Sequence, residues 1–170
     1  MEVDFEKQFL DIYKQNTDAI FRYCLLRVSD RELAKDLAQD TFMKVWQYAT
    51  KGEKIVNLRA FLFTTARNLI IDHYRKKKAT SLDGLMEQGF DVGQDTSQSL
   101  IDHLDGEKAL ALLGSVPEKY RVAIYLQYVE GLSIKEIAEV TSETENNISV
   151  RIHRGLQKLR SVLREQHGEQ

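Results

Sequence analysis

The side chains best suited to chemistry lie near the C-terminus, on a segment that is expected to be helical from residue 145 onward. Apolar residues at helical spacing predict one buried stripe: Ile148, Ile152, Leu156, Leu159 and Leu163. At about 100° per residue, the opposite side carries mostly polar and basic residues: Asn146, Val150, His153, Arg154 and Gln157, flanked by Ser149 and Arg151. Asn and Arg can pair with base edges through two hydrogen bonds, and Arg and Lys hold phosphates, so this face predicts binding in the DNA major groove.

The segment before it is expected to supply the first helix of a helix-turn-helix. Ser133 and Glu136 have the spacing of a capping box. Thr141 and Ser142 favour a turn, and Thr144 is suited to cap the second helix. A hairpin with a solvated charged face is the plainer interpretation. DNA binding is favoured over it because residues 146–164 contain five Arg or Lys and no acid.

No arrangement of residues predicts catalysis. The four histidines, His73, His103, His153 and His167, lack Cys or carboxylate partners at metal-ligand spacing. The sequence has no Gly-rich phosphate loop, nucleophile elbow or HExxH motif. We therefore expect no enzyme activity, no metal and no cofactor.

Composition and charge suggest a mostly helical protein whose charges are unevenly distributed. The chain has 170 residues with one Pro, and 42% of its residues are hydrophobic. Residues 59–78 hold six basic side chains and one acidic, whereas residues 79–106 hold six acidic and none basic. Cys24, the only cysteine, is expected to be a buried reduced thiol. With no apolar run that could span a bilayer and no signal-peptide pattern, we expect a cytoplasmic location without membrane insertion.

The N-terminal part predicts two helices. Residues 5–28 have a helical pattern with an expected interruption near Asn16–Asp18, and Ser29 or Asp30 is expected to cap the next helix. The expected inward residues of that next helix are Leu33, Leu37, Ala38, Thr41, Phe42, Val45 and Trp46, and the outward ones are Lys35, Asp36, Gln39, Asp40, Met43, Lys44 and Gln47. Periodicity leaves two interpretations of the outward face open: a solvated surface or a docking surface.

A third helix is expected over residues 57–78, capped by Asn57. Its expected apolar side consists of Leu58, Phe61, Leu62, Thr65, Leu69 and Ile70. One interpretation of the basic cluster Arg75–Lys78 at its end is favourable interaction with the helix dipole. The functional alternative is single-stranded DNA binding, in which charges hold phosphates and rings stack on bases. It would add Arg59, Phe63, Arg67, Asn68, His73 and Tyr74 to that cluster.

These elements predict an all-α protein with two small helical domains. We expect an N-terminal helical domain at residues 1–78, a flexible acidic linker at 79–106 and a C-terminal helix-turn-helix domain at 107–170. Pro117 is expected in a helix first turn, and Gly131 as a C-terminal cap.

Taken together, four stretches resemble the extracytoplasmic-function (ECF) family of bacterial RNA polymerase sigma factors. They are LAKDLAQDTFMKVW (33–46), NLRAFLFTTARNLIIDHYRKKK (57–78), PEKYRVAIYLQYVEGLSIKEIAE (117–139) and ENNISVRIHRGLQKLR (145–160). The resemblance implies a non-enzymatic subunit that directs core RNA polymerase to promoter DNA, with an anti-sigma factor as a candidate further partner.

The resemblance also implies roles for individual residues. Core-polymerase binding falls on Asp36, Gln39, Asp40, Met43 and Lys44. Minus-ten DNA contacts fall on Lys54, Arg67, Asn68, His73, Tyr74, Arg75, Lys76 and Lys77, with Asn68 lining the pocket for a flipped base. Minus-thirty-five contacts fall on Asn147, Ser149, Val150, Arg151, His153 and Arg154. The helical face described above adds Asn146 to this set.

The helix-turn-helix departs from the family pattern in four places. Ser142 stands where Gly is usual, and Glu143 where an apolar residue is common. Ser149 and Val150 stand where basic and small polar residues are frequent, so the preferred DNA sequence does not carry over from relatives. Two alternatives remain open: a stand-alone helix-turn-helix regulator that binds duplex DNA without polymerase, and a helical adaptor that binds only protein.

Overall fold

The computed structural model describes residues 2–80 and 113–168, and these contain helices and no strand. The helices belong to two compact units that divide between residues 91 and 92. The predicted all-α fold with two helical domains is therefore confirmed. The predicted acidic linker, residues 79–106, lies outside the described residues except for Ala79 and Thr80, which belong to the third helix.

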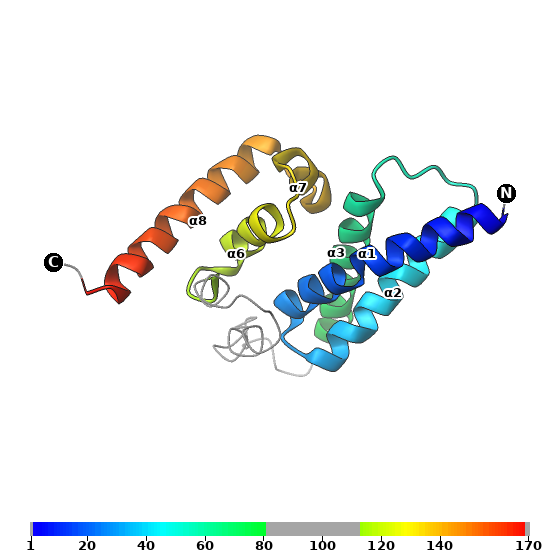
Figure 1. Ribbon diagram of the computed structural model, residues 1–170. Coiled ribbons are helices and arrows are strands. Elements are labelled where there is room, and N and C mark those ends of the chain that lie inside the picture. Colours follow the sequence, from blue (N-terminus) through cyan, green and yellow to red (C-terminus); the bar gives the residue numbers. More distant parts are fainter. Residues whose placement is uncertain (1, 81–112, 169–170) are drawn as a thin grey trace. The chain divides into compact units, whose positions relative to one another are not determined.

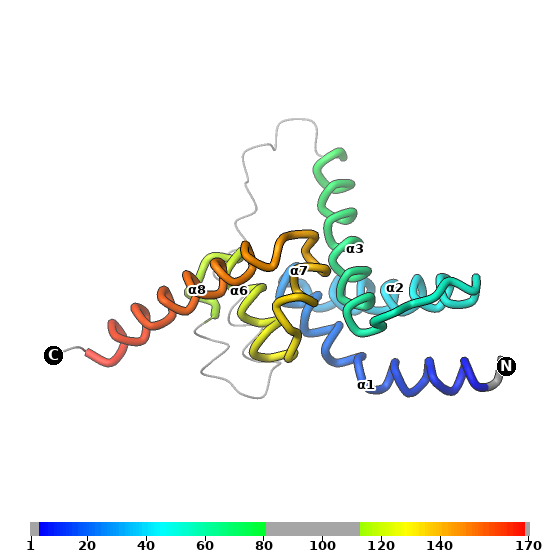
Figure 2. Tube along the Cα trace, turned by 90° about the horizontal axis from the view of Figure 1, so that it is seen from above, coloured from blue at the N-terminus to red at the C-terminus, as the bar shows by residue number. Residues whose placement is uncertain are grey.

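The N-terminal unit is built on an antiparallel pair of helices, α1 (Glu2–Val28) and α2 (Arg31–Thr50), which run side by side in Figures 1 and 2. Ser29 makes the reversal possible with a φ of 59°, and Asp30 caps α2 by accepting a hydrogen bond from the Leu33 amide. Aromatic rings join the far ends of the pair, because the Trp46 ring centroid lies 5.2 Å from that of Phe5 and 4.8 Å from that of Phe9.

The first helix is continuous, so the predicted interruption near Asn16–Asp18 is wrong. The Asn16 amide donates to the Ile12 carbonyl, and the Thr17 hydroxyl donates to the Tyr13 carbonyl. Both side chains bond back to the preceding turn instead of competing for the backbone groups of their own turn. Residues that favour turns are thereby accommodated within the helix.

The second helix has the faces that periodicity predicted. Leu37, Ala38, Thr41, Phe42 and Val45 are buried, and all seven residues of the predicted outward face are exposed. Leu33 and Trp46, also predicted to face inward, are half-buried. The Thr41 hydroxyl is satisfied inside the core because it donates to the Leu37 carbonyl.

The third helix, α3 (Leu58–Thr80), crosses the α1–α2 pair (Figure 2) and begins at the predicted cap, where Asn57 accepts from the Ala60 amide. Its buried side was predicted wrongly in part. The buried residues are Ala60, Leu62, Phe63, Ala66 and Ile70, whereas Leu58, Phe61, Thr65 and Leu69 are half-buried. Two small residues, Ala60 and Ala66, were not recognised as inward because alanine carries a weak hydrophobic signal.

Cys24 lies in the core of this unit, as predicted, and burial raises the pKa of its thiol to about 12 although Arg27 lowers it. Because the thiolate is the reactive form, we expect alkylation at pH 8 to be roughly a thousandfold slower in the native protein than in denaturant. The rate at which a thiol-alkylating reagent labels Cys24, measured with and without denaturant, tests this. Equal labelling rates would contradict the burial of Cys24.

The same pKa shift makes stability depend on pH. Since the folded pKa of the Cys24 thiol exceeds the ordinary value of 9.0, the contribution of this thiol to stability is complete below pH 9 and decreases towards pH 12.

The C-terminal unit contains α6 (Glu118–Ile124), the π-helical turn η1 (Tyr125–Val129), α7 (Ile134–Thr141) and α8 (Glu145–Gln166). Helix α6 and helix α7 both pack against the N-terminal half of α8, whose other half extends beyond them (Figure 1). The buried residues of α8 accordingly lie in that first half: Ile148, Ile152 and Gly155. The predicted buried stripe is therefore wrong beyond Ile152, because Leu156, Leu159 and Leu163 are only half-buried.

Pro117 and Gly131 lie at the two ends of the segment formed by α6 and η1. Pro117 precedes the first helical residue as the N-cap, one position earlier than predicted, and Gly131 has the positive φ of 72° expected after a helix end. Arg121 secures the segment before α6, since its guanidinium donates to the carbonyls of Leu113, Gly114 and Val116. Burial lowers the pKa of Arg121.

Candidate nucleic-acid interfaces

The helix-turn-helix is formed by local hydrogen bonds that the sequence predicted. Ser133 and Glu136 form a reciprocal capping box, with N–O distances of 3.1 and 3.2 Å. Ser142 takes the left-handed conformation, with φ 57° and ψ 40°, in the turn. Thr144 then caps α8 by accepting from the Asn147 amide at 3.1 Å. A tight turn thus forms with Ser142 at the position where the resemblance predicts a glycine.

The predicted recognition face of α8 is exposed to solvent. Its exposed members are Asn146, Asn147, Ser149, Val150, His153 and Arg154. Opposite them, Ile148 and Ile152 are buried against the rest of the unit. The core therefore fixes the rotation of α8 about its axis and leaves the Asn, Ser and Arg side chains available to a ligand.

Arg151 differs from the other predicted contacts because it is only partly exposed and has an intramolecular partner. Its two terminal nitrogens donate to the two carboxylate oxygens of Glu143, at 2.7 and 2.6 Å. Each side chain retains 26% of its accessible surface. This bidentate pair links the turn to the second turn of α8 and holds the Arg151 guanidinium in one orientation.

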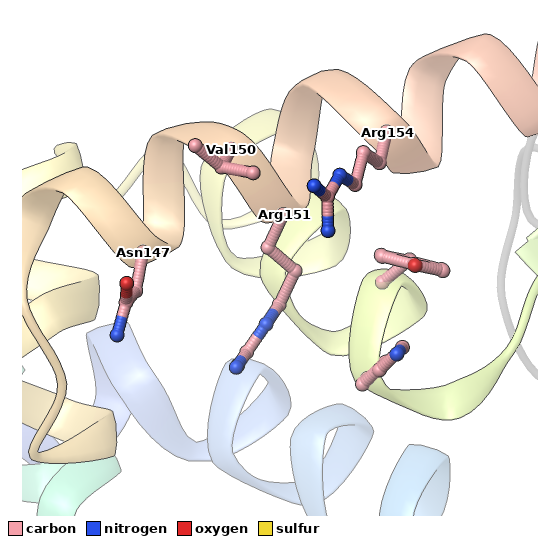
Figure 3. Close-up of a pocket in the computed structure, with 6 residues that line it drawn as sticks. Asn147, Val150, Arg151 and Arg154 are labelled. Atoms are coloured by element: carbon pink, nitrogen blue, oxygen red, sulfur yellow. The ribbon is translucent and has the colours of Figure 1, made fainter.

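Between α6 and α8 lies a cavity of about 340 Å³. It is lined by Lys119, Tyr120, Asn147, Val150, Arg151 and Arg154, of which Figure 3 labels the four that come from α8. Lys119 and Tyr120 were not among the predicted site residues. They follow Pro117 in a different helix, so only the packing of α6 on α8 brings them to this face.

The predicted minus-ten residues of α3 do not share one side of the helix. Asn68 and Arg75 are exposed and lie seven residues apart, which is close to two helical turns, whereas Lys77 lies on the side opposite Asn68. Lys76 and Lys54, the latter in the loop before α3, are exposed; Arg67 and His73 are half-buried. Tyr74 is half-buried and its hydroxyl donates to the Arg27 carbonyl at 2.9 Å, which attaches α3 to the end of α1.

Phe63 cannot stack on a base, so its predicted place among the DNA-binding aromatics is wrong. It is fully buried, and its ring meets the Tyr23 ring edge-on with centroids 5.5 Å apart. The nearby Arg59 guanidinium lies 5.9 Å from the Phe63 ring centroid. The residue was misassigned because the way α3 crosses α1 decides which of its residues are buried. The sequence pattern does not specify that crossing.

The predicted docking residues of α2 form one exposed face. Asp36, Gln39, Asp40, Met43 and Lys44 are all exposed, and Met43 retains 58% of its accessible surface. A smaller cavity of about 190 Å³ between α1 and α2 includes Gln39 and Lys35 in its lining, beside Tyr13, Phe21 and Phe42. An exposed methionine is typical of a protein-binding surface.

Within the described ranges, no three His, Cys, Asp or Glu side chains gather closely enough to hold a metal ion. Among the same residues, no helix has the length and apolar character to cross a membrane.

Two family models match separate parts of the chain. The model described as Sigma-70 region 2 matches residues 12–80, and the model described as Sigma-70, region 4 matches residues 106–159. The ECF RNA polymerase sigma factor SigW of Bacillus subtilis (strain 168) is 30% identical over 166 residues, which cover 92% of this chain and 87% of SigW. The chain belongs to the ECF sigma factor family.

Other sigma factors match this chain over a similar share of its length. SigL of Mycobacterium tuberculosis (strain ATCC 25618 / H37Rv) is 29% identical over 155 residues, covering 91% of this chain and 88% of SigL. The sigma factor RpoE of Bartonella quintana, solved in complex with the anti-sigma factor NepR, superposes with a TM-score of 0.70 at 25% identity. That similarity covers 93% of this ECF sigma factor and 98% of the RpoE chain. The protein is a sigma factor that directs RNA polymerase to promoters.

Proposed function

We propose that this ECF sigma factor reads the minus-thirty-five promoter element with α8. The observation that carries the proposal is the exposed face of that helix, on which Asn147, His153 and Arg154 lie away from the buried Ile148 and Ile152. An α-helix with such a face fits the major groove, where Asn pairs with adenine and Arg with guanine through two hydrogen bonds. The absence of acidic side chains between residues 146 and 164 avoids repulsion from the phosphates.

The N-terminal unit, in this proposal, opens and reads the minus-ten element through α3. Asn68, Arg75 and Lys76 are exposed on that helix, and Lys54 is exposed in the loop before it. Phe63 takes no part because it is buried, and the Tyr74 hydroxyl already bonds to α1. Single-strand binding therefore depends chiefly on the amide of Asn68 for a base and on the cations for the backbone.

The exposed face of α2 is proposed to dock on core RNA polymerase. Docking places the two DNA-reading units within a larger complex, which explains how a chain with a net charge of −2 can act on DNA. The chain is proposed to act in the cytoplasm as an initiation factor without catalytic activity of its own.

An anti-sigma factor is proposed as a further partner. Support comes from the Bartonella quintana sigma factor RpoE, which was solved in complex with the anti-sigma factor NepR and matches this chain over 93% of its length.

Asp40→Ala is expected to weaken binding to core RNA polymerase about fivefold, equivalent to roughly 1 kcal/mol, because it removes one exposed carboxylate from the centre of the docking face. The free energy of unfolding should change little, since Asp40 is exposed and lies in the interior of α2. Affinity for core polymerase and a denaturation curve of the free protein measure the two effects.

Asp11→Ala is the matched control, because Asp11 is an exposed carboxylate on α1 outside the docking set. It changes the net charge equally and should leave core binding unchanged. If Asp40→Ala and Asp11→Ala bind core polymerase as tightly as the natural chain, the α2 face is not the docking surface.

A further inference from the structure

The basic end of α3 extends beyond the packed part of the N-terminal unit. Ile70 is the last buried residue of this helix, and every residue from Arg75 to Thr80 is exposed. Figure 2 shows this end pointing away from the α1–α2 pair. At about 1.5 Å per residue, the exposed end is roughly 9 Å long. Its direction therefore depends on what holds the helix just before Arg75.

Tyr74 is the residue that attaches α3 to the rest of the unit at this point. It follows Ile70 by four positions, so its ring lies on the side of the helix that faces the core. The ring is half-buried, and its hydroxyl donates to the Arg27 carbonyl at 2.9 Å. One hydrogen bond thus joins the start of the exposed end of α3 to the end of α1.

The acceptor of this hydrogen bond is itself held in place. Arg27 lies in the last turn of α1, where carbonyl groups have no partner within the helix. Its guanidinium donates to the hydroxyl of the fully buried Tyr23 at 3.2 Å. The Tyr74 hydroxyl therefore satisfies a carbonyl that α1 cannot pair internally, and it does so at a fixed point of the core.

This arrangement gives Tyr74 a role other than the predicted contact with DNA. Its hydroxyl is directed to α1 and its ring is half-buried, whereas a base stacks on an open ring face. Arg75 and Lys76 directly follow it and are exposed. Because neighbouring residues of one helix have fixed relative positions, the attachment of Tyr74 determines where these two positive charges lie.

We propose that Tyr74 is a positioning residue for minus-ten recognition, whose hydroxyl, bonded to the Arg27 carbonyl, holds Arg75 and Lys76 in place along the backbone of the opened strand. The inference rests on the proposed reading of the minus-ten element by α3. A neutral hydrogen bond shifts an equilibrium about fivefold. If its loss lowers the population of the competent orientation of α3 by that factor, binding of the strand weakens equally.

The test is Tyr74→Phe in the full chain, bound to core polymerase, on a promoter fragment from which the natural chain initiates. The substitution removes the hydroxyl and keeps the ring. Permanganate reactivity of unpaired thymines near the start site should show an opening equilibrium about fivefold less favourable. The base preference within the minus-ten element should be unchanged, because Asn68 precedes Ile70 and lies in the packed part of α3.

Neutralising the two cations tests whether Tyr74 acts through them. In a chain that carries Arg75→Gln and Lys76→Gln, the further change Tyr74→Phe should reduce opening by about twofold or less, since the charges that it positions are then absent. An equal loss with and without the two cations would show that the hydroxyl acts independently of them. That result would overturn the proposal.

Tyr48→Phe is the matched control, because it removes a hydroxyl from another ring of the same unit. Tyr48 lies near the end of α2 and retains 37% of its accessible surface. It should leave promoter opening unchanged. If Tyr74→Phe opens promoters as well as Tyr48→Phe does, the positioning role is refuted and the promoter function stands. If the natural chain with core polymerase opens no promoter, the proposed function itself fails.

A denaturation curve separates positioning from loss of folding. Tyr74→Phe should remain folded at the temperature of the opening assay, because it removes one partly exposed hydrogen bond. The fluorescence of Trp46 reports on this unit. If promoter opening falls only at temperatures at which Trp46 fluorescence shows unfolding, the hydroxyl serves stability alone and the proposal is wrong.

Discussion

Arg154→Ala is expected to lower promoter-dependent initiation by roughly fivefold to 150-fold, the equivalent of about 1–3 kcal/mol for one bidentate base contact. Arg154 is exposed on the recognition face of α8 and forms no ion pair among the described residues, so its guanidinium is free to meet a guanine edge. The loss should depend on sequence and should disappear on promoters altered at the contacted base pair. Initiation rates on a set of single-base promoter variants measure this dependence.

Arg164→Ala is a suitable control for Arg154→Ala. Arg164 is an exposed arginine in the last turn of the same helix, beyond the half of α8 that packs on α6 and α7. It should change initiation little on any promoter. An equal loss on every promoter variant for Arg154→Ala would contradict base reading and would instead make Arg154 a contact to the DNA backbone.

Gly155→Ala is expected to destabilise the C-terminal unit, although alanine is the better helix former. An added Cβ would lie 2.6 Å from Ile124 Cδ1 and 2.9 Å from Tyr120 Cβ, closer than carbon atoms approach. The Ile124 methyl is the end of a flexible side chain, but Tyr120 Cβ moves only with the backbone of α6. Overpacking costs roughly 1–3 kcal/mol, which exceeds the gain of about 1 kcal/mol in helix propensity.

Denaturation followed by two signals isolates the effect of Gly155→Ala. The single tryptophan, Trp46, belongs to the N-terminal unit and its fluorescence transition should be unchanged. The far-UV circular dichroism transition should begin at lower denaturant. Ile124→Val, which removes the Cδ1 atom, should recover part of the loss in the double variant. A variant as stable as the natural chain would show that α6 and α8 are not in close contact.

Local rules predicted those parts of the fold that depend on neighbours in sequence. The Ser133–Glu136 capping box, the Asp30 and Thr144 caps and the two faces of α2 follow from hydrogen bonds and periodicity within one helix. Tertiary packing decided the rest. Phe63 is inward because α3 meets Tyr23 of α1 at that point, and Gly155 is required because α6 crosses α8 there.

The candidate site divides in the same way. The exposed recognition face of α8 was predictable from the spacing of Ile148 and Ile152. Lys119 was not, because it reaches that face only through the packing of α6 on α8. The Glu143–Arg151 pair left one signal in the sequence: an acidic residue in the turn, at a position where the family resemblance predicts an apolar one.

The most direct test of sigma-factor function adds the purified chain to core RNA polymerase and maps initiation on genomic fragments. We expect the chain to co-elute with core polymerase and to produce start sites that share two motifs at a fixed spacing. Failure to associate with core polymerase, together with tight binding of duplex DNA by the isolated chain, would contradict this. The protein would then act as a stand-alone helix-turn-helix regulator, and the exposed face of α2 would be an ordinary solvated surface.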